Sequence, residues 1–351
     1  MRNPDAWRSL RSPFLTGLAL SLAVVLLSLA ALGEGTAAKP DLPTLPAVPT
    51  PAPAPTPSAP AQGERDRAQT LRVLQKDGTV ESMTMADYLW RVAAAEMPAS
   101  FEPDALRAQA VCARTYALWK LNAKSHQEEG ADICADSSCC QAYISPGDAA
   151  QKWGANAEAY SQKIAGAVAD TDAQILTYNG APIQAVFFSS AAGSTAGAEE
   201  VWGRALPYLV PVDSPEGDEV PNYRSTVTLT AEEVKALAKE AGLGCDLSGE
   251  PSGWVTDVVR TDSGRVASLK LGGAELSGGA ARSLFSLRSA AFEVSEAEGS
   301  FTFSVTGYGH GVGMSQYGAN ALAKQGKGWR EILAHYYTGA ELQDAWYSQH
   351  T

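Results

Sequence analysis

A glutamate ends an apolar helical stripe in the first third of the chain. Tyr88, Val92 and Glu96 follow one another at intervals of four residues, which puts Glu96 on a face predicted to be buried. A carboxyl group that loses hydration keeps its proton to higher pH, as a general acid must near neutrality. The alternative is a glutamate near a helix end that reaches solvent or pairs with Arg107 or Arg114.

A second group of chemically active residues lies 30 positions further on. His126, Cys134, Cys139 and Cys140 supply one imidazole and three thiols within a short stretch. These are the ligand types of a structural tetrahedral zinc site. The alternative is a disulfide from Cys134 to one of its two neighbours, which would leave an odd thiol and give the histidine no role.

A glycine-rich stretch at 307–318 carries one histidine and follows a predicted strand. Dinucleotide binding is poorly supported, because no Lys-Ser/Thr pair follows and too little chain remains for a βαβ unit. A serine hydrolase with Ser315 and His310 does not fit the G-x-S-x-G elbow, since Tyr317 stands where the last glycine belongs. Two interpretations remain: a tight structural loop, or a glycan groove in which His310, Ser315, Gln316 and Tyr317 contact sugars.

Two helices should position the glutamate. The first is predicted from Thr84, whose hydroxyl can cap it together with Asp87, to about Glu96, where Pro98 stops it. The second should begin with a proline in its first turn and cover about 103–123, with small side chains on one face.

The rest of the chain alternates strands and helices. Strands are predicted at 173–178 and 182–189 across Asn179-Gly180, at 223–229, at 254–261 and 265–271, and at 300–306. Helices are predicted from a capping box at Thr230 and Glu233, and at 280–287, 315–324 and 329–337. Elements in mixed order without regular βαβ units predict an α+β fold, with helices and antiparallel strands around a binding cleft and an inserted α/β subdomain.

Composition narrows the class of protein. The 351 residues carry a formal net charge of −12, which disfavours binding to nucleic acid. Five cysteines are too few for a disulfide scaffold, and Cys112 and Cys245 are expected to be buried and reduced.

The N-terminal region is predicted to lie outside the fold. An uncharged apolar stretch at 12–33 is long enough to cross a bilayer, and three arginines precede it. We predict an uncleaved anchor at 14–33 with the N-terminus in the cytoplasm, although the small residues at 36–38 allow cleavage. Nine prolines between Lys39 and Pro60 then predict a stiff spacer of roughly 60–70 Å, which suggests a target in the cell wall.

The predicted organisation is therefore as follows: a cytoplasmic N-terminus at 1–13, the anchor at 14–33, a Pro-rich linker at 34–64, a core at 65–213 and 293–345, and an inserted subdomain at 214–292.

Several segments together resemble one family. They are Tyr88-Leu and Glu96-Met-Pro; Ala105-Leu-Arg-Ala-Gln-Ala-Val-Cys-Ala-Arg-Thr-Tyr-Ala117; Cys140-Gln-Ala-Tyr143; Phe188-Ser-Ser190 with Gly193-Ser-Thr195; Val201-Trp-Gly203 with Pro207-Tyr-Leu209; Gly309-His-Gly-Val-Gly-Met-Ser-Gln-Tyr-Gly-Ala319; and Ile332-Leu-Ala-His-Tyr-Tyr337. In this order, from about 70 to 342, they resemble the stage II sporulation protein D family (SpoIID), which includes amidase enhancers of the LytB type.

The resemblance implies a lytic transglycosylase that cuts peptidoglycan glycan strands, particularly those without stem peptides, during engulfment in an endospore-forming bacterium. It places the family's catalytic glutamate on Glu96. It places a zinc site on the His/Cys cluster named above, with Cys139 at a position where the family often has His. Residues expected to orient the strand are Gln109, Arg114, Ser189, His310, Ser315, Gln316 and Tyr317.

In the implied mechanism the muramic 6-hydroxyl is the nucleophile, so no second carboxylate is required, although Asp87, Asp170 and Asp172 stay open as further acids. The runner-up function is a non-catalytic wall-binding module that activates a partner amidase. The resemblance also implies a single-pass membrane protein with its catalytic domain outside the cytoplasm, in a complex with the amidase SpoIIP and the membrane protein SpoIIM.

Overall fold

The computed structural model describes residues 63–345. The anchor predicted at 14–33, the cytoplasmic segment and almost all of the Pro-rich linker lie outside the described residues. Within residues 63–345, no helix combines the length and apolar character needed to span a bilayer.

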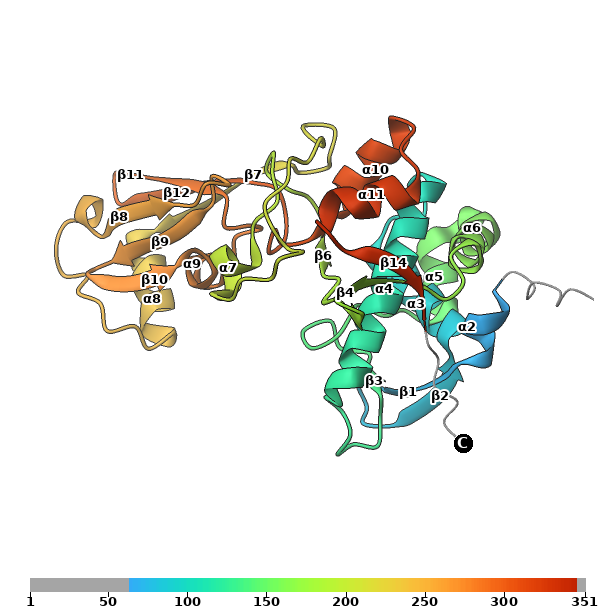
Figure 1. The fold of residues 1–351 in the computed structure, drawn as a ribbon. Helices are drawn as coiled ribbons and strands as arrows, with labels where there is room; N and C mark the ends of the chain where they lie inside the picture. The colour runs from blue at the N-terminus through green and yellow to red at the C-terminus, as the bar shows by residue number, and fades with distance from the viewer. Residues whose placement is uncertain (1–62, 346–351) are drawn as a thin grey trace, which may run out of the picture. The chain divides into compact units, whose positions relative to one another are not determined.

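Helix α4 forms the centre of the core (Figure 1), and the elements that pack against it include α3, α6, α10, α11 and strand β4. Its small side chains permit this close packing, because Ala105, Ala108, Ala110, Ala113 and Ala117 are all fully buried. The core helices are α2 (Glu64–Ala68), α3 (Met85–Glu96), α4 (Pro103–Ala123), α5 (Pro146–Trp153), α6 (Ala157–Asp170), α10 (Gln316–Lys324) and α11 (Trp329–Tyr336).

Helix α3 has the predicted ends. The Thr84 hydroxyl accepts a hydrogen bond from the Asp87 backbone N–H at 3.0 Å and so caps the first turn. The helix ends at Glu96 because Met97, which precedes Pro98, is extended (φ −118°, ψ 139°). This abrupt end puts the Glu96 side chain on the last helical turn.

The core strands form small sheets. Strands β1 (Thr70–Leu74) and β2 (Val80–Thr84) are antiparallel, and β3 (Ile133–Cys134) joins β1 in parallel. A second sheet has the order β14-β4-β5, and a two-stranded parallel pair joins β6 to β13. Their bounds are β4 (Gln174–Tyr178), β5 (Ala181–Pro182), β6 (Phe187–Phe188), β13 (Met314–Ser315) and β14 (Glu341–Asp344).

The predicted hairpin at Asn179-Gly180 is confirmed, with both residues at positive φ (51° and 78°). Its second arm is shorter than predicted. Strand β5 ends at Pro182, although the Ile183 N–H still donates to the Leu176 carbonyl of β4 at 3.1 Å, and the chain then pairs with β13 through β6.

The subdomain inserted in the core has its own apolar centre, formed around Trp254, Phe285 and Phe303. Its two sheets have the orders β10-β9-β8 and β11-β12-β7. The elements are β7 (Arg224–Thr230), α8 (Ala231–Glu240), β8 (Val255–Arg260), β9 (Val266–Leu271), β10 (Ala274–Ser277), α9 (Gly278–Leu284), β11 (Phe292–Ala297) and β12 (Ser300–Thr306). The remaining short helices are α7 (Ala198–Trp202) and the 3₁₀ turns η1 (Gly154–Asn156) and η2 (Pro251–Gly253).

The predicted insert boundaries at 214 and 292 need correction. Residues 214–216 pack on the core, because the Ser214 hydroxyl bonds that of Tyr336 and Ser315 bonds the Glu216 carboxylate. At the other end, β11 and β12 pair with each other and β12 pairs with β7 along its whole length. The insert therefore comprises about 224–306.

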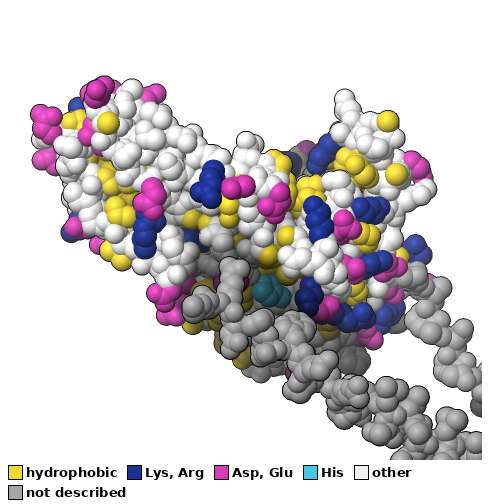
Figure 2. All heavy atoms as spheres, turned by 90° about the horizontal axis from the view of Figure 1, so that it is seen from above, with side chains coloured by type: hydrophobic (Ala, Val, Ile, Leu, Met, Phe, Trp, Pro, Cys, Tyr) yellow, Lys and Arg dark blue, Asp and Glu magenta, His cyan; other side chains and the backbone are white. Residues whose placement is uncertain are grey.

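Helices α5 and α6 are absent from the sequence predictions. Ser145 caps α5 by accepting the Asp148 N–H at 3.1 Å, and Pro146 occupies the first turn. The architecture is α+β, as predicted. On the face shown in Figure 2, acidic and basic side chains are interspersed, without a continuous basic stripe.

Candidate active site

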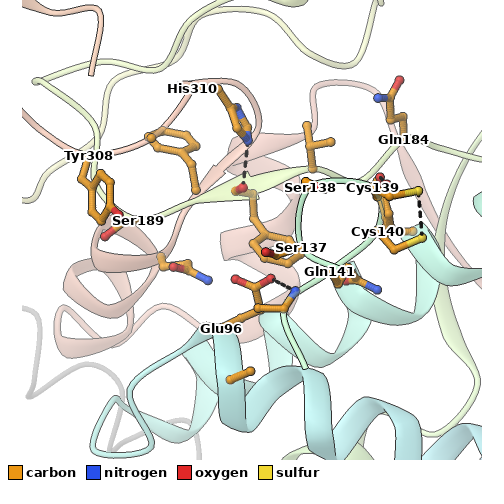
Figure 3. Close-up of a pocket in the computed structure, with 18 of the residues that line it drawn as sticks. Glu96, Ser137, Ser138, Cys139, Cys140, Gln141, Gln184, Ser189, Tyr308 and His310 are labelled. Carbon is orange, nitrogen blue, oxygen red and sulfur yellow. Dashed lines mark hydrogen bonds between the residues drawn. The ribbon is translucent and has the colours of Figure 1, made fainter. Parts of the chain in front are cut away.

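A cavity of about 920 Å³ brings together segments far apart in the chain. Its walls are Glu96 at the end of α3, the loop at 137–142, the stretch at 184–189 and the glycine-rich loop at 308–310. Figure 3 shows the Glu96 carboxylate and the His310 ring on opposite sides of this space. A cavity of this size with a few convergent polar groups is typical of a binding site.

Glu96 is half-buried in the cavity wall. Burial raises the pKa of its carboxyl group above the ordinary value of 4.5, and a hydrogen bond from the Ala142 backbone N–H opposes that rise. The N–H donates to Oε1 at 2.6 Å, which fixes one oxygen and leaves Oε2 to carry a proton (Figure 3). Neither alternative ion pair forms, because Arg107 bonds Asp170 and Arg114 bonds Asp66.

The loop that carries Ala142 is anchored by its neighbour. The Gln141 side-chain amide donates to the Tyr88 hydroxyl at 3.1 Å and to the Ala113 carbonyl at 3.3 Å. Tyr88 lies two turns before Glu96 on α3. The predicted apolar stripe therefore holds both the glutamate and the loop that orients it.

His310 lies in the cavity wall as a neutral ring. Its Nδ1 accepts the Val312 N–H at 3.1 Å, so Nε2 carries the proton and donates to the Phe187 carbonyl, also at 3.1 Å. Burial, with a smaller contribution from the nearby Arg282 charge, lowers the pKa of His310 to about 4. Because both ring nitrogens are engaged by backbone, the ring is part of the wall and not a proton acceptor for substrate.

Two further predicted residues line the cavity. Ser189 is half-buried there, and Gln316 contributes from the first turn of α10. Gln109 does not line the cavity. Its fully buried Oε1 accepts a hydrogen bond from the Gln316 side chain at 3.3 Å, so Gln109 supports Gln316 from behind.

Arg114 was predicted to contact substrate, and the structure corrects this. Its guanidinium is fully buried and pairs with the equally buried Asp66, with Nε 3.0 Å from Oδ1. It also donates to the Gln174 carbonyl at 3.0 Å. With these partners it cannot reach the cavity.

Ser315 and Tyr317 also lie elsewhere. Ser315 is fully buried and caps α10 by accepting the Gly318 N–H at 3.3 Å, and its hydroxyl donates to the Glu216 carboxylate. Tyr317 packs edge-on against Phe101, with 4.9 Å between ring centroids, and lines a separate pocket. Successive residues at the start of α10 face in different directions, so Gln316 faces the cavity while Ser315 and Tyr317, on either side of it, face other neighbours.

The other candidate acids are engaged in structural contacts. The Asp87 carboxylate accepts a hydrogen bond from the Thr84 hydroxyl at 2.8 Å at the opposite end of α3, and Asp170 and Asp172 pair with Arg107 and Arg65. Among residues 63–345, no carboxylate other than Glu96 lines this cavity.

The four predicted metal ligands lie together, with their ligand atoms all within 4.8 Å of one another. His126 Nε2 is 3.5 Å from Cys139 Sγ and 3.4 Å from Cys140 Sγ, and the two sulfurs are 3.8 Å apart. A tetrahedral zinc ion with its usual bond lengths separates N and S by about 3.6 Å and two sulfurs by about 3.8 Å. The cysteines are free, as are the two outside the cluster; Cys112 is buried as predicted and Cys245 is half-buried. The cluster could therefore hold a metal ion.

Several lining residues were not predicted. Trp202 and Tyr308 expose 42% and 43% of their surfaces, and Gln184 and Arg282 complete the wall. Trp202 stands within a motif segment of the family and Tyr308 within the glycine-rich stretch at 307–318, but nothing in the spacing distinguishes an exposed aromatic ring from a core one. Arg282 belongs to the insert, which the sequence did not connect with the site.

Known proteins resemble this chain over most of its length. The family model described as stage II sporulation protein (SpoIID) matches residues 75–178, which contain Glu96 and the whole His/Cys cluster. A stage II sporulation protein D from Bacillus amyloliquefaciens is 39% identical over 270 residues, 76% of each chain. The protein of that name from Bacillus subtilis is also 39% identical, again covering 76% of each chain. An amidase enhancer from Bacillus subtilis is 28% identical over 70% of this chain and 39% of its own length. This chain therefore belongs to the stage II sporulation protein D family.

Proposed function

We propose that the protein is a lytic transglycosylase that cuts peptidoglycan glycan strands, with Glu96 as its acid and base. The observation that carries this proposal is the position of Glu96. It is a half-buried carboxyl group with a raised pKa, and it faces a cavity large enough for several sugar rings. A protonated carboxyl group is what the departing glycosidic oxygen requires.

Two steps follow from this geometry. Glu96 Oε2 gives its proton to the oxygen that bridges muramic acid and the next glucosamine, and that bond breaks as positive charge grows on the anomeric carbon. The muramic 6-hydroxyl then attacks this carbon and returns its proton to the Glu96 carboxylate, giving a 1,6-anhydro end. The N–H of Ala142 stabilises the carboxylate between the two steps.

The isolation of Glu96 supports an internal nucleophile. Ordinary glycosidases place a second carboxylate about 5–9.5 Å from the acid, either to attack the sugar or to activate water. Within residues 63–345 the cavity wall offers no such partner. The exposed rings of Trp202 and Tyr308 offer apolar faces for sugars, while Ser189, Gln184 and Gln316 offer polar groups.

We propose that the His/Cys cluster binds a zinc ion and that the role of this ion is structural. His126, Cys134, Cys139 and Cys140 would hold it, and four protein ligands leave no open position for substrate. Cys139 and Cys140 themselves belong to the cavity wall, three and two residues before Ala142. The ion would fix the loop whose backbone N–H orients Glu96.

The main test compares the full chain with Glu96→Gln on denuded glycan strands. The amide keeps the acceptor for Ala142 but cannot supply a proton, so release of anhydro-ended fragments should fall at least about a hundredfold. Mass spectrometry separates these products from reducing ends by one water. Glu250→Gln, on the exposed surface of the insert, is the matched control and should remain active. Undiminished cutting by Glu96→Gln would reject the mechanism.

The amidase-enhancer relative supports a second candidate, a non-catalytic module that raises the activity of a partner amidase. Under that hypothesis neither protein cuts glycan, and both increase the rate of a purified amidase. Any anhydro product that depends on Glu96 excludes it as the sole function. For the full chain we propose a membrane-anchored location facing the wall, with SpoIIP and SpoIIM as partners.

Metal removal tests the zinc proposal separately. Elemental analysis of the purified protein should find about one zinc per chain. Treatment with a chelator should lower both the melting temperature and glycan cleavage, because the Ala142 loop loses its anchor. Added zinc should restore both. A metal-free protein with unchanged stability would contradict the proposal.

A further inference from the structure

One buried cation in the insert has no partner. Arg265, between β8 and β9, is only 2% exposed, yet Nε and both terminal nitrogens lack a hydrogen-bond partner among the described residues. Burial lowers the pKa of its guanidinium to about 10, so the group remains charged at neutral pH. Buried arginines are almost always paired, because an isolated buried charge strongly destabilises the fold.

The glycine-rich loop makes room for this guanidinium. A Cβ added to Gly311 would lie 2.4 Å from Arg265 Cζ and 2.6 Å from one terminal nitrogen. The guanidinium therefore lies directly against the Gly311 backbone, which no other residue type would allow. Gly311 is one residue after His310, so the cation lies immediately behind the wall of the catalytic cavity.

Arg265 lines a small pocket of about 60 Å³ that borders the catalytic cavity. Arg282, Gly309 and His310 belong to the walls of both spaces. A water molecule needs about 10–15 Å³, so the pocket has room for a carboxylate group. Arg282 uses Nε to bond the Leu287 carbonyl at 3.3 Å, and its guanidinium is the second cation of the pocket.

The charges of the pocket are not balanced. Glu200 is the acidic residue in its wall, and its carboxylate already accepts a hydrogen bond from Ser263 at 2.8 Å. The nearby Glu216 accepts hydrogen bonds from the Ala191 N–H and the Ser315 hydroxyl. With two arginines and one glutamate in its wall, the pocket carries one uncompensated positive charge.

We propose that Arg265 and Arg282 form a carboxylate-binding subsite beside the catalytic cavity, and that its ligand is the free lactyl carboxylate of a muramic acid residue in the glycan strand. This inference rests on the proposed transglycosylase function. It names two arginines that would distinguish strands with free lactyl carboxylates from strands that carry stem peptides. A guanidinium offers parallel N–H groups that match the two oxygens of a carboxylate. When a stem peptide is attached, the lactyl carbonyl belongs to an uncharged amide that carries a bulky substituent. This amide neither fits into the subsite nor neutralises the positive charge of its arginines.

The test uses two forms of the same denuded strands, one with free carboxylates and one with those groups converted to methylamides. The full-length protein should cut the free form with a kcat/KM at least about tenfold higher, as expected for hydrogen bonds to a charged group. Arg265→Met and Arg282→Gln should each bring this ratio close to one. Arg224→Met removes an exposed arginine of the same insert and should keep the wild-type ratio.

Stability measurements distinguish a ligand-binding residue from a structural one. Removing an unpaired buried charge relieves a desolvation cost, so Arg265→Met should leave Tm unchanged or raised. A large fall in Tm would show that Arg265 stabilises the fold and would overturn its assignment. Arg282 is half-buried, so Arg282→Gln tests the second guanidinium of the subsite without altering a fully buried position.

Binding separates this proposal from the catalytic one. The Glu96→Gln chain should bind short strands with free carboxylates at least about tenfold more tightly than their methylamides, even though it cuts neither. If the wild type cuts no strand but this preference persists, the catalytic proposal fails and the subsite stands. Equal affinity for the two forms would reject the subsite.

Discussion

At the scale of single residues, Glu96 is subject to two opposing influences. Burial favours its neutral form, while the N–H of Ala142 favours the carboxylate, and burial is the larger effect. A group with this balance can release and recover a proton without large rearrangement, because Oε1 can accept the Ala142 N–H whether or not Oε2 carries a proton.

The raised pKa of Glu96 also predicts a pH-dependent cost in stability. The protonated carboxyl group fits the fold, so its contribution is fully present below the ordinary pKa of 4.5 and is lost as pH rises through the folded value. Glu96→Gln cannot ionise. Its Tm should therefore exceed that of the wild type at pH 7, and the difference should shrink below about pH 4. Thermal melts across this range, with Glu250→Gln as the control, measure it; a pH-independent difference would contradict the prediction.

Residue types were easier to predict from the sequence than residue directions. Apolar periodicity placed Glu96 on a buried face, and ligand types placed the metal cluster, because both signals are local. Arg114 and Ser315 lie in equally distinctive segments, but whether a side chain faces the cavity or the core depends on segments that pack from far along the chain. Asp66, the partner of Arg114, is 48 positions away.

At the scale of elements, the glycine-rich loop is fixed by close backbone approach. A Cβ on Gly313 would lie 2.1 Å from the Val186 carbonyl oxygen, and this glycine has a φ of +79°. The loop can therefore lie against the strand segment that ends at Phe188, and together they form one wall of the cavity.

Alanine substitutions at Gly313 and Gly326 separate the effect of backbone conformation from the effect of close contact. Gly326 has a similar φ of +87° but nothing within 4 Å of an added Cβ. Gly326→Ala should cost about 1–2 kcal/mol of unfolding free energy through backbone strain alone. Gly313→Ala should cost clearly more and should also reduce glycan cleavage. Chemical denaturation measures both variants, and equal costs would mean that the close contact has no energetic weight.

The capping signals of α3 and α8 marked the starts of these helices correctly, and α8 has the complete capping box at Thr230 and Glu233, whereas the Ser145 cap of α5 was not recognised in the sequence. Helix α6 was missed because no capping side chain and no proline mark its start. The short strands β3, β6 and β13 have only two residues each. Such strands form because tertiary packing brings them together, so no sequence window identifies them.

At the scale of the whole molecule, Arg114 connects distant parts of the core. Its guanidinium bonds Asp66 on α2, the Val168 carbonyl on α6 and the Gln174 carbonyl on β4. The pair is fully buried on both sides, so the loss of one partner leaves a charge that water cannot reach.

Asp66→Asn should therefore lower the free energy of unfolding by about 3–5 kcal/mol. The matched control is Asp218→Asn, which breaks the exposed pair with Arg224 and should change stability little. Denaturant melts of both variants provide the comparison. A small loss in Asp66→Asn would show that solvent or another group compensates the arginine.

The insert interrupts the chain between the two halves of the cavity wall. His310 bonds the Phe187 carbonyl across 123 positions of sequence, and the paired strands β6 and β13 lie on either side of the insert. During synthesis the ribosome must therefore release the entire insert before the second half of this wall exists. A nascent or truncated chain that ends before residue 306 already contains Glu96 but lacks Tyr308, His310 and Gln316, so its cavity has only one of the two walls between which a ligand would lie.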